Sequence, residues 1–174
     1  MTVDEPWLSP EQQQAWRHWI ALSTALPAVL NRQLQEDSGL SLSDYDVLVA
    51  LSETTDGRLR VSDLAAAVGW ERSRLSHHVR RMAGRGLVER EECADDGRGA
   101  WITMTSRGTT AIREAAPAHA RLVGQLVFDD LDDDELAVLE TVLAGVRERA
   151  GGAALSRRGA RGTRPSRPGP TGSA

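Results

Sequence analysis

The sequence contains no lysine, so all 21 basic residues are arginine. This absence excludes sites that need a lysine amine, such as the phosphate loop of nucleotide hydrolases, pyridoxal-phosphate sites and lysine general bases. Arginine stays charged at physiological pH, and its planar guanidinium suits phosphate oxygens and the edges of guanine. The basic residues therefore favour binding of an anionic partner over amine catalysis.

Thiols and long apolar runs are also scarce. A single cysteine, Cys93, can form neither an internal disulfide nor a multi-thiolate metal site. We expect it to serve in packing, and thiol sensing is the alternative. No run of 18 apolar residues occurs, and residues 1–10 lack the basic start and apolar stretch of a signal peptide. We therefore expect a cytoplasmic protein with no membrane span.

Charge is segregated along the chain. The 174 residues, 40% of them hydrophobic, suffice for one domain with a core. The net charge of −4 divides into −7 over residues 1–57, +3 over 58–107, −5 over 108–150 and +5 over 151–174. A basic middle between acidic flanks indicates an anionic partner, although chance variation along solvated faces is the alternative. The last segment, rich in Gly, Pro, Ser and Arg, is predicted to be a disordered tail that either attracts polyanions or only aids solubility.

The first half of the chain is predicted to be almost entirely helical. The apolar spacing predicts, in order, a helix over 9–37, a helix from residue 43, a brief strand around 59–61, and helices over 62–68 and 70–83. Ser9, Pro10 and Gln12 form the pattern of a capping box with proline at the first helical position. Ser43 and Ser62 are predicted to start the next helices.

The second half is predicted to add a hairpin and two helices. Two strands over 87–93 and 100–105 enclose a polar tip at 95–99. Ser106 is predicted to cap a long helix that Pro117 interrupts, and Asp132 with Glu135 is predicted to cap the last helix. This last helix carries a heptad-like stripe that needs a facing helix. The stripe consists of Leu136, Leu139, Leu143 and Val146.

This order of elements is the plan of a winged helix-turn-helix, mostly α with a small β-hairpin wing. In the helix over 70–83, Leu75, Val79 and Met82 define a buried stripe. The opposite face is polar, cationic and free of acid, and it carries Ser73, Arg74, His77, Arg80 and Arg81. Such a face suits duplex DNA, with a merely solvated face as the alternative. We expect the first three side chains to read bases and the two later arginines to hold phosphates.

The predicted wing tip offers a second contact with DNA. Arg98 lies between two glycines there and can extend into a minor groove, where the negative potential favours guanidinium. The alternative is a surface ion pair of Arg98 with Asp95 or Asp96, which contributes little.

Residues from about Trp16 to Val146 resemble the MarR family of transcriptional regulators. The similarity is strongest over 71–82 and 86–90, and it continues through Asp96-Gly97-Arg98 to the segment 102–108. The last two stretches resemble the Asp-x-Arg wing and the strand ending in Leu-Thr-x-x-Gly, with Met104 in place of the usual leucine. Peroxide-sensing subfamilies place a reactive cysteine in the first long helix, where this chain has none.

The resemblance implies a homodimer that represses transcription and is released by a small aromatic ligand. The expected domain spans 9–150, with dimerisation helices over 9–37 and 106–150 and the winged helix-turn-helix over 43–105, followed by the tail over 151–174. The heptad-like stripe fits such a dimer independently. Two-fold symmetry then predicts a pseudo-palindromic operator with half-sites roughly 10 bp apart.

Other functions find less support in the residues. The acidic run from Asp130 lacks the glycine and the final glutamate of a calcium loop, and His77 and His78 point in different directions on one helix. We therefore expect no metal, no cofactor and no catalytic residue, since an enzyme would need a second domain. A winged-helix module that binds protein is the rival interpretation. The residues do not show which side chains would line a ligand pocket, although tryptophans are candidates.

Overall fold

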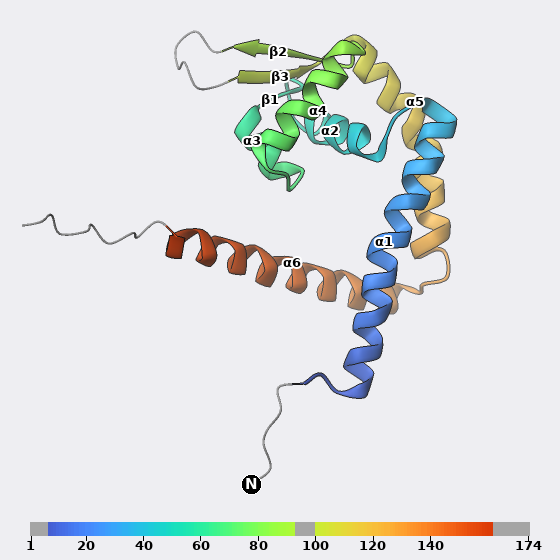
Figure 1. The fold of residues 1–174 in the computed structure, drawn as a ribbon. Helices are drawn as coiled ribbons and strands as arrows, with labels where there is room; N and C mark the ends of the chain where they lie inside the picture. Colours follow the sequence, from blue (N-terminus) through green and yellow to red (C-terminus); the bar gives the residue numbers. More distant parts are fainter. Residues whose placement is uncertain (1–6, 93–99, 162–174) are drawn as a thin grey trace, which may run out of the picture. The chain divides into compact units, whose positions relative to one another are not determined.

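The computed structural model describes residues 7–92 and 100–161 and divides into two compact units, one up to Gly124 and one from Gln125 (Figure 1). In chain order the elements are α1 Pro10–Ser38, α2 Leu42–Ser52, β1 Arg58–Arg60, α3 Val61–Ala67, α4 Arg72–Gly84, β2 Val88–Glu92, β3 Ala100–Met104, α5 Ser106–Val123, the π-helical turn η1 Gly124–Phe128, and α6 Asp133–Arg161. The mostly helical architecture with one small sheet confirms the predicted fold class.

The first helix begins and ends as its sequence predicts. The Ser9 hydroxyl accepts the N–H of Gln12 at 3.3 Å, and the Gln12 side chain accepts the N–H of Ser9 at 2.9 Å, with Pro10 in the first turn. At the other end Gly39 adopts a left-handed conformation with φ of 68° and donates its N–H to Gln35. A side chain is strained in this conformation, which glycine adopts freely. These caps fix where α1 stops and α2 can turn back.

Two predicted helix starts are wrong by one or two residues. The cap of α2 is Ser41 rather than Ser43, because the Ser41 hydroxyl accepts the N–H of Asp44 at 3.1 Å. Likewise Thr105, not Ser106, caps α5, since its Oγ1 accepts the N–H of Gly108 at 3.0 Å. In each case neighbouring hydroxyls compete for one capping position, and the backbone geometry selects among them.

Two further helix predictions also need correction. Ser62 lies inside α3, whose N-cap is Arg60 with no side-chain cap, and the Ser62 hydroxyl instead donates to Asp63. Pro117 does not interrupt α5 but lies within it. A proline removes only one N–H from the helical ladder, and packing of α5 against α1 and α2 stabilises the helix.

The three strands form an antiparallel sheet in the order β1-β3-β2. Leu59 of β1 lies opposite Ile102 of β3, and Val88 of β2 lies opposite Met104 of β3. The β2–β3 hairpin confirms the two predicted wing strands within a few residues at their ends. The predicted tip with Arg98 lies outside the described residues, and so does Cys93 at the end of the first predicted wing strand.

A single core joins the helices to the inner face of this sheet. Its fully buried side chains come from α1, α2, α3, α4, β2 and β3. They include Leu34, Leu48, Leu51, Leu64, Leu75, Met82 and Ile102. Burying large aliphatic side chains contributes roughly 1.5–3 kcal/mol each, so this cluster fixes how α4 sits on the domain.

The second unit is dominated by α6. Its start confirms the prediction, since the N–H of Glu135 donates to Asp132 at 2.8 Å and the N–H of Asp132 donates to Glu135 at 3.1 Å. The helix runs on to Arg161, so residues 151–161, which we expected in the tail, are helical. Residues 162–174 lie outside the described part of the chain. Apolar side chains, among them Leu136, Leu143 and Val146, are exposed in the single chain.

Candidate nucleic-acid interface and ligand pocket

The helix α4 presents the two faces that its sequence predicts. Leu75, Val79 and Met82 are buried in the core. The side chains on the opposite face are all exposed, namely Ser73, Arg74, His77, Arg80 and Arg81. Within α4 the sequence has no acidic residue, because Glu71 precedes the helix as its N-cap. The exposed face of α4 is therefore a cationic surface that can meet an anionic partner.

Two arginines of this face are held by aromatic neighbours. The guanidinium of Arg74 lies over the ring of Trp70, 4.3 Å from its centroid. The guanidinium of Arg81 contacts Nδ1 of His77 at 3.3 Å and Nδ1 of His78 at 2.8 Å. Such contacts restrict long side chains that would otherwise be disordered, and they leave further N–H donors of each guanidinium for a ligand.

Sequence reasoning missed the buried polar group beneath this face. His78 is 6% exposed and Asp44 of α2 is 2% exposed, and Nε2 of His78 lies 3.1 Å from Oδ1 of Asp44. Arg85 donates to Oδ2 of Asp44 at 2.7 Å and to the carbonyl of Gly39 at 2.8 Å. Since Asp44 and Arg85 lie 41 positions apart, no local pattern could reveal the contact.

These partners keep Asp44 ionised. Burial by itself disfavours the charged form, but His78, the N–H of Ser41 and Arg85 outweigh it and hold the pKa of Asp44 well below its ordinary value. An ionised carboxylate with several donors is a fixed anchor between α2 and α4.

One of the five tryptophans, Trp101, lies in the sheet and contacts two arginines. Trp101 of β3 lies opposite Arg60 of β1, and the guanidinium groups of Arg58 and Arg60 lie 4.2 and 5.2 Å from the centroid of its ring. Arg58 also pairs with Asp56 at 3.3 Å. Trp101 therefore supports the base of the wing through cation–π contacts.

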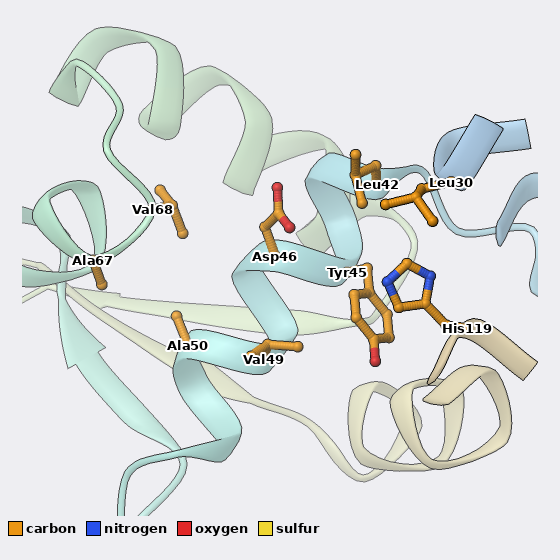
Figure 2. A pocket seen from close by; sticks show the side chains of 9 residues that line it. All are labelled: Leu30, Leu42, Tyr45, Asp46, Val49, Ala50, Ala67, Val68 and His119. Atoms are coloured by element: carbon orange, nitrogen blue, oxygen red, sulfur yellow. The ribbon is translucent and has the colours of Figure 1, made fainter. Parts of the chain in front are cut away.

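A pocket of about 530 Å³ lies among α1, α2, α3 and α5 (Figure 2). Its wall is mainly aliphatic, with Leu30, Leu42, Val49, Ala50, Ala67 and Val68. The polar groups are Tyr45, Asp46 and His119, and none of the five tryptophans lines it. The rings of Tyr45 and His119 lie 4.5 Å apart and tilt by 47°, and Figure 2 shows them side by side. An apolar cleft with a few polar groups is typical of a small-molecule site.

The titratable groups of the pocket affect one another. Burial lowers the pKa of His119, against the effect of Asp46, and favours the neutral ring. Nδ1 of His119 lies 3.2 Å from the side-chain oxygen of Gln33. Partial burial raises the pKa of Asp46, opposed by His119 and His78, and burial together with Asp46 raises the pKa of Tyr45. The pocket thus combines a phenol, a buried imidazole with a lowered pKa and the exposed carboxyl group of Asp46.

Other kinds of site find no support in the part of the chain that the structure describes. Those residues contain no group of three or more His, Cys, Asp or Glu side chains that could hold a metal ion. The described helices include none that is both long and apolar enough to span a bilayer.

Comparison with known proteins agrees with this architecture. A MarR family model matches residues 38–99. Sco3205, a MarR family transcriptional regulator from Streptomyces coelicolor solved in complex with DNA, is 40% identical, with a TM-score of 0.78 over 82% of this chain and 89% of that chain. AbsC, a MarR family regulator from the same organism, is 38% identical, with a TM-score of 0.79 over 84% of this chain and 98% of that chain.

A more distant structure shares the fold. The organohalide-sensing regulator RdhR, in its 2,4-dichlorophenol-bound form, has a TM-score of 0.70 at 17% identity, over 86% of this chain and 89% of that chain. No curated protein sequence gives a significant match. From the similarity to Sco3205 and AbsC, the chain belongs to the MarR family of transcriptional regulators, and it is not an enzyme.

Proposed function

We propose that this regulator is a homodimeric repressor that binds a pseudo-palindromic operator and is released by a small aromatic ligand. The exposed, acid-free face of α4 carries the proposal. Ser73, Arg74 and His77 lie in the first half of α4 and read base edges, whereas Arg80 and Arg81 hold phosphates. Arg98, outside the described residues, reaches the minor groove from the wing. That Sco3205 was solved in complex with DNA supports this assignment.

Exposed apolar surface on α1 and α6 supports the homodimer. Trp16 is 54% exposed and Ile20 is 47% exposed on α1, and on α6 Leu136 and Leu143 are similarly open in the single chain. Large apolar side chains at helical spacing need a partner surface, and a two-fold dimer of interleaved helices provides one. Two copies of α4 related by this axis then enter successive major grooves about 10 bp apart.

The ligand pocket supports regulation by a small aromatic molecule. Its volume has ample room for a molecule the size of a substituted phenol, and the tilted rings of Tyr45 and His119 offer aromatic contacts. Tyr45 is adjacent in sequence to Asp44, which contacts His78 of α4. A ligand that displaces this turn of α2 therefore also shifts the DNA-facing helix. The phenol bound to the related fold of RdhR is consistent with this assignment.

The experiment is a binding titration with duplex DNA from upstream of the protein's own gene, repeated at several salt concentrations. Arg74→Ala and Arg80→Ala should each weaken binding, and Arg80→Ala should lower the salt slope by about 0.9 for each lost phosphate contact, one in each protomer of the dimer. Arg113→Ala, an exposed arginine on α5, makes the same change of net charge and should leave binding unchanged. If the two α4 variants bind DNA like the wild type, the proposed interface is wrong and the protein-binding alternative gains support.

A further inference from the structure

His78 stands apart from the other polar residues of α4, because its ring is buried while its neighbours on the cationic face are exposed. One edge of the ring contacts Asp44, a buried carboxylate on α2. The other edge contacts Arg81, which lies in the exposed row of α4. His78 therefore joins the interior of the domain to the surface that meets DNA.

The contact with Arg81 determines where the proton of His78 lies. A guanidinium has only donors, so Nδ1 of His78, 2.8 Å from Arg81, must accept. In the neutral ring the proton is then on Nε2, which faces the carboxylate of Asp44 at 3.1 Å, within contact distance but not well aligned for a strong hydrogen bond. Asp44 is fixed in turn by Arg85 and by the N–H of Ser41 at 2.9 Å. The carboxylate thus favours the tautomer that Arg81 needs.

We propose that His78, oriented by Asp44, is a positioning residue that holds the Arg81 guanidinium in place for a DNA phosphate. This inference rests on the proposed role of the α4 face. Arg81 uses one N–H for His78 and one for His77, and the remaining donors of its fork are left for phosphate oxygens. An arginine already held in position loses less side-chain entropy when it binds, which tightens the complex.

The same ring also supports a second arginine. Trp70 meets His78 edge to face at a centroid distance of 5.2 Å, and Arg74 lies over Trp70. One buried imidazole is therefore next to the supports of two arginines of the cationic face. This arrangement favours positioning over a purely space-filling role, for which an aliphatic side chain would serve equally well.

Two substitutions separate the two edges of the ring. The Oδ1 of an asparagine occupies the place of Nδ1, so His78→Asn keeps an acceptor for Arg81. The Nε2 of a glutamine occupies the place of the imidazole Nε2, so His78→Gln keeps the donor towards Asp44 but offers Arg81 no acceptor. His78→Gln should weaken DNA binding about two- to tenfold for each bound protomer, the cost of ordering one free side chain, whereas His78→Asn should bind within about twofold of the wild type.

The decisive measurement is a double-mutant cycle with Arg81→Ala, read as affinity for the upstream duplex, with thermal unfolding of each variant alongside. If His78 acts mainly through Arg81, most of the effect of His78→Gln disappears on the Arg81→Ala background, and any remainder reflects its support of Arg74 through Trp70. Full additivity, or His78→Gln binding as tightly as the wild type, overturns the positioning role, since general loss of structure would act equally in both backgrounds. If Arg80→Ala weakens binding but Arg81→Ala and His78→Gln do not, only this inference fails. If Arg74→Ala, Arg80→Ala and Arg81→Ala all bind normally, the proposed DNA face fails and the inference fails with it.

Discussion

Replacing Asp44 by asparagine tests the buried contact between α2 and α4 most directly. The neutral amide keeps the shape but removes the charge that Arg85 at 2.7 Å and His78 at 3.1 Å meet. It also turns part of an acceptor-only group into a donor, which then faces other donors. Hydrogen bonds to a buried charge contribute about 1.5–3 kcal/mol, and the Arg85 contact counts for less because its side chain is 45% exposed. We expect a loss of about 2–3 kcal/mol in the free energy of unfolding.

The assay is urea unfolding at one fixed protein concentration, because the stability of the proposed dimer would depend on concentration. Asp63→Asn, which neutralises an exposed carboxylate on α3, should change stability by less than about 0.5 kcal/mol. A loss from Asp44→Asn as small as that of this control would refute the view that the carboxylate anchors α4.

The pH dependence gives an independent check on the same residue. The folded state lowers the pKa of Asp44 below its unfolded value of 3.8. Its contribution to stability is therefore complete above that value and is lost as the pH falls towards the folded pKa. The stability difference between wild type and Asp44→Asn should be constant near neutral pH and shrink below about pH 4. A difference that grows on acidification would contradict the lowered pKa.

Three further outcomes are expected. Leu143→Asp on α6 should convert the proposed dimer to monomers, as judged by the molecular mass from light scattering. Thr141→Asp, on the opposite side of the helix, should leave the mass unchanged. A monomeric wild type would refute the dimer. Asp46 lines the pocket, and its negative charge should repel an anion, so the neutral salicylamide should raise the melting temperature more than the anion salicylate does. Asp46→Asn should reduce this difference. Stronger binding of salicylate to the wild type would argue against a role for this carboxylate. Gly108→Ala should lower the free energy of unfolding in urea by about 1–3 kcal/mol or more, because a Cβ there would collide with the carbonyl of Leu87. The Cβ added by Gly84→Ala would lie in open space, so that variant should be neutral or mildly stabilising. Equal effects of the two substitutions would contradict the close packing at Gly108.

The features that were predictable from sequence are those governed by neighbours along the chain. The capping box of Ser9, the cap at Asp132 and the buried stripe of α4 all follow from spacings of three or four residues. The predicted helix starts were wrong where two or three hydroxyl side chains lie close together in the sequence, as at Thr105 and Ser106. A choice between adjacent caps depends on the backbone path, which the pattern does not contain.

In the candidate interface, too, features set by local sequence were predictable and features set by tertiary packing were not. The exposure of Arg74, His77 and Arg80 follows from helical periodicity alone. The contact of Asp44 with His78 could not be predicted, because it depends on how α2 packs beside α4. The pocket was also beyond the sequence, since its walls come from four helices and its aromatic groups are Tyr45 and His119 rather than a tryptophan.

The turn between α1 and α2 has a mechanical consequence. A glycine in the left-handed conformation between two helices ordinarily permits hinge motion. Here Arg85, at the end of α4, donates a hydrogen bond to the carbonyl of Gly39, and Asn31 of α1 accepts the N–H of Leu42 at 2.9 Å. These two hydrogen bonds restrict bending between α1 and α2, so we expect a change in the tilt of α1 to be transmitted to α4. In the proposed two-fold dimer, the distance between the two copies of α4 would then depend on the helices that join the protomers. We therefore expect substitutions far from the DNA-facing residues to alter the preferred spacing of the operator half-sites.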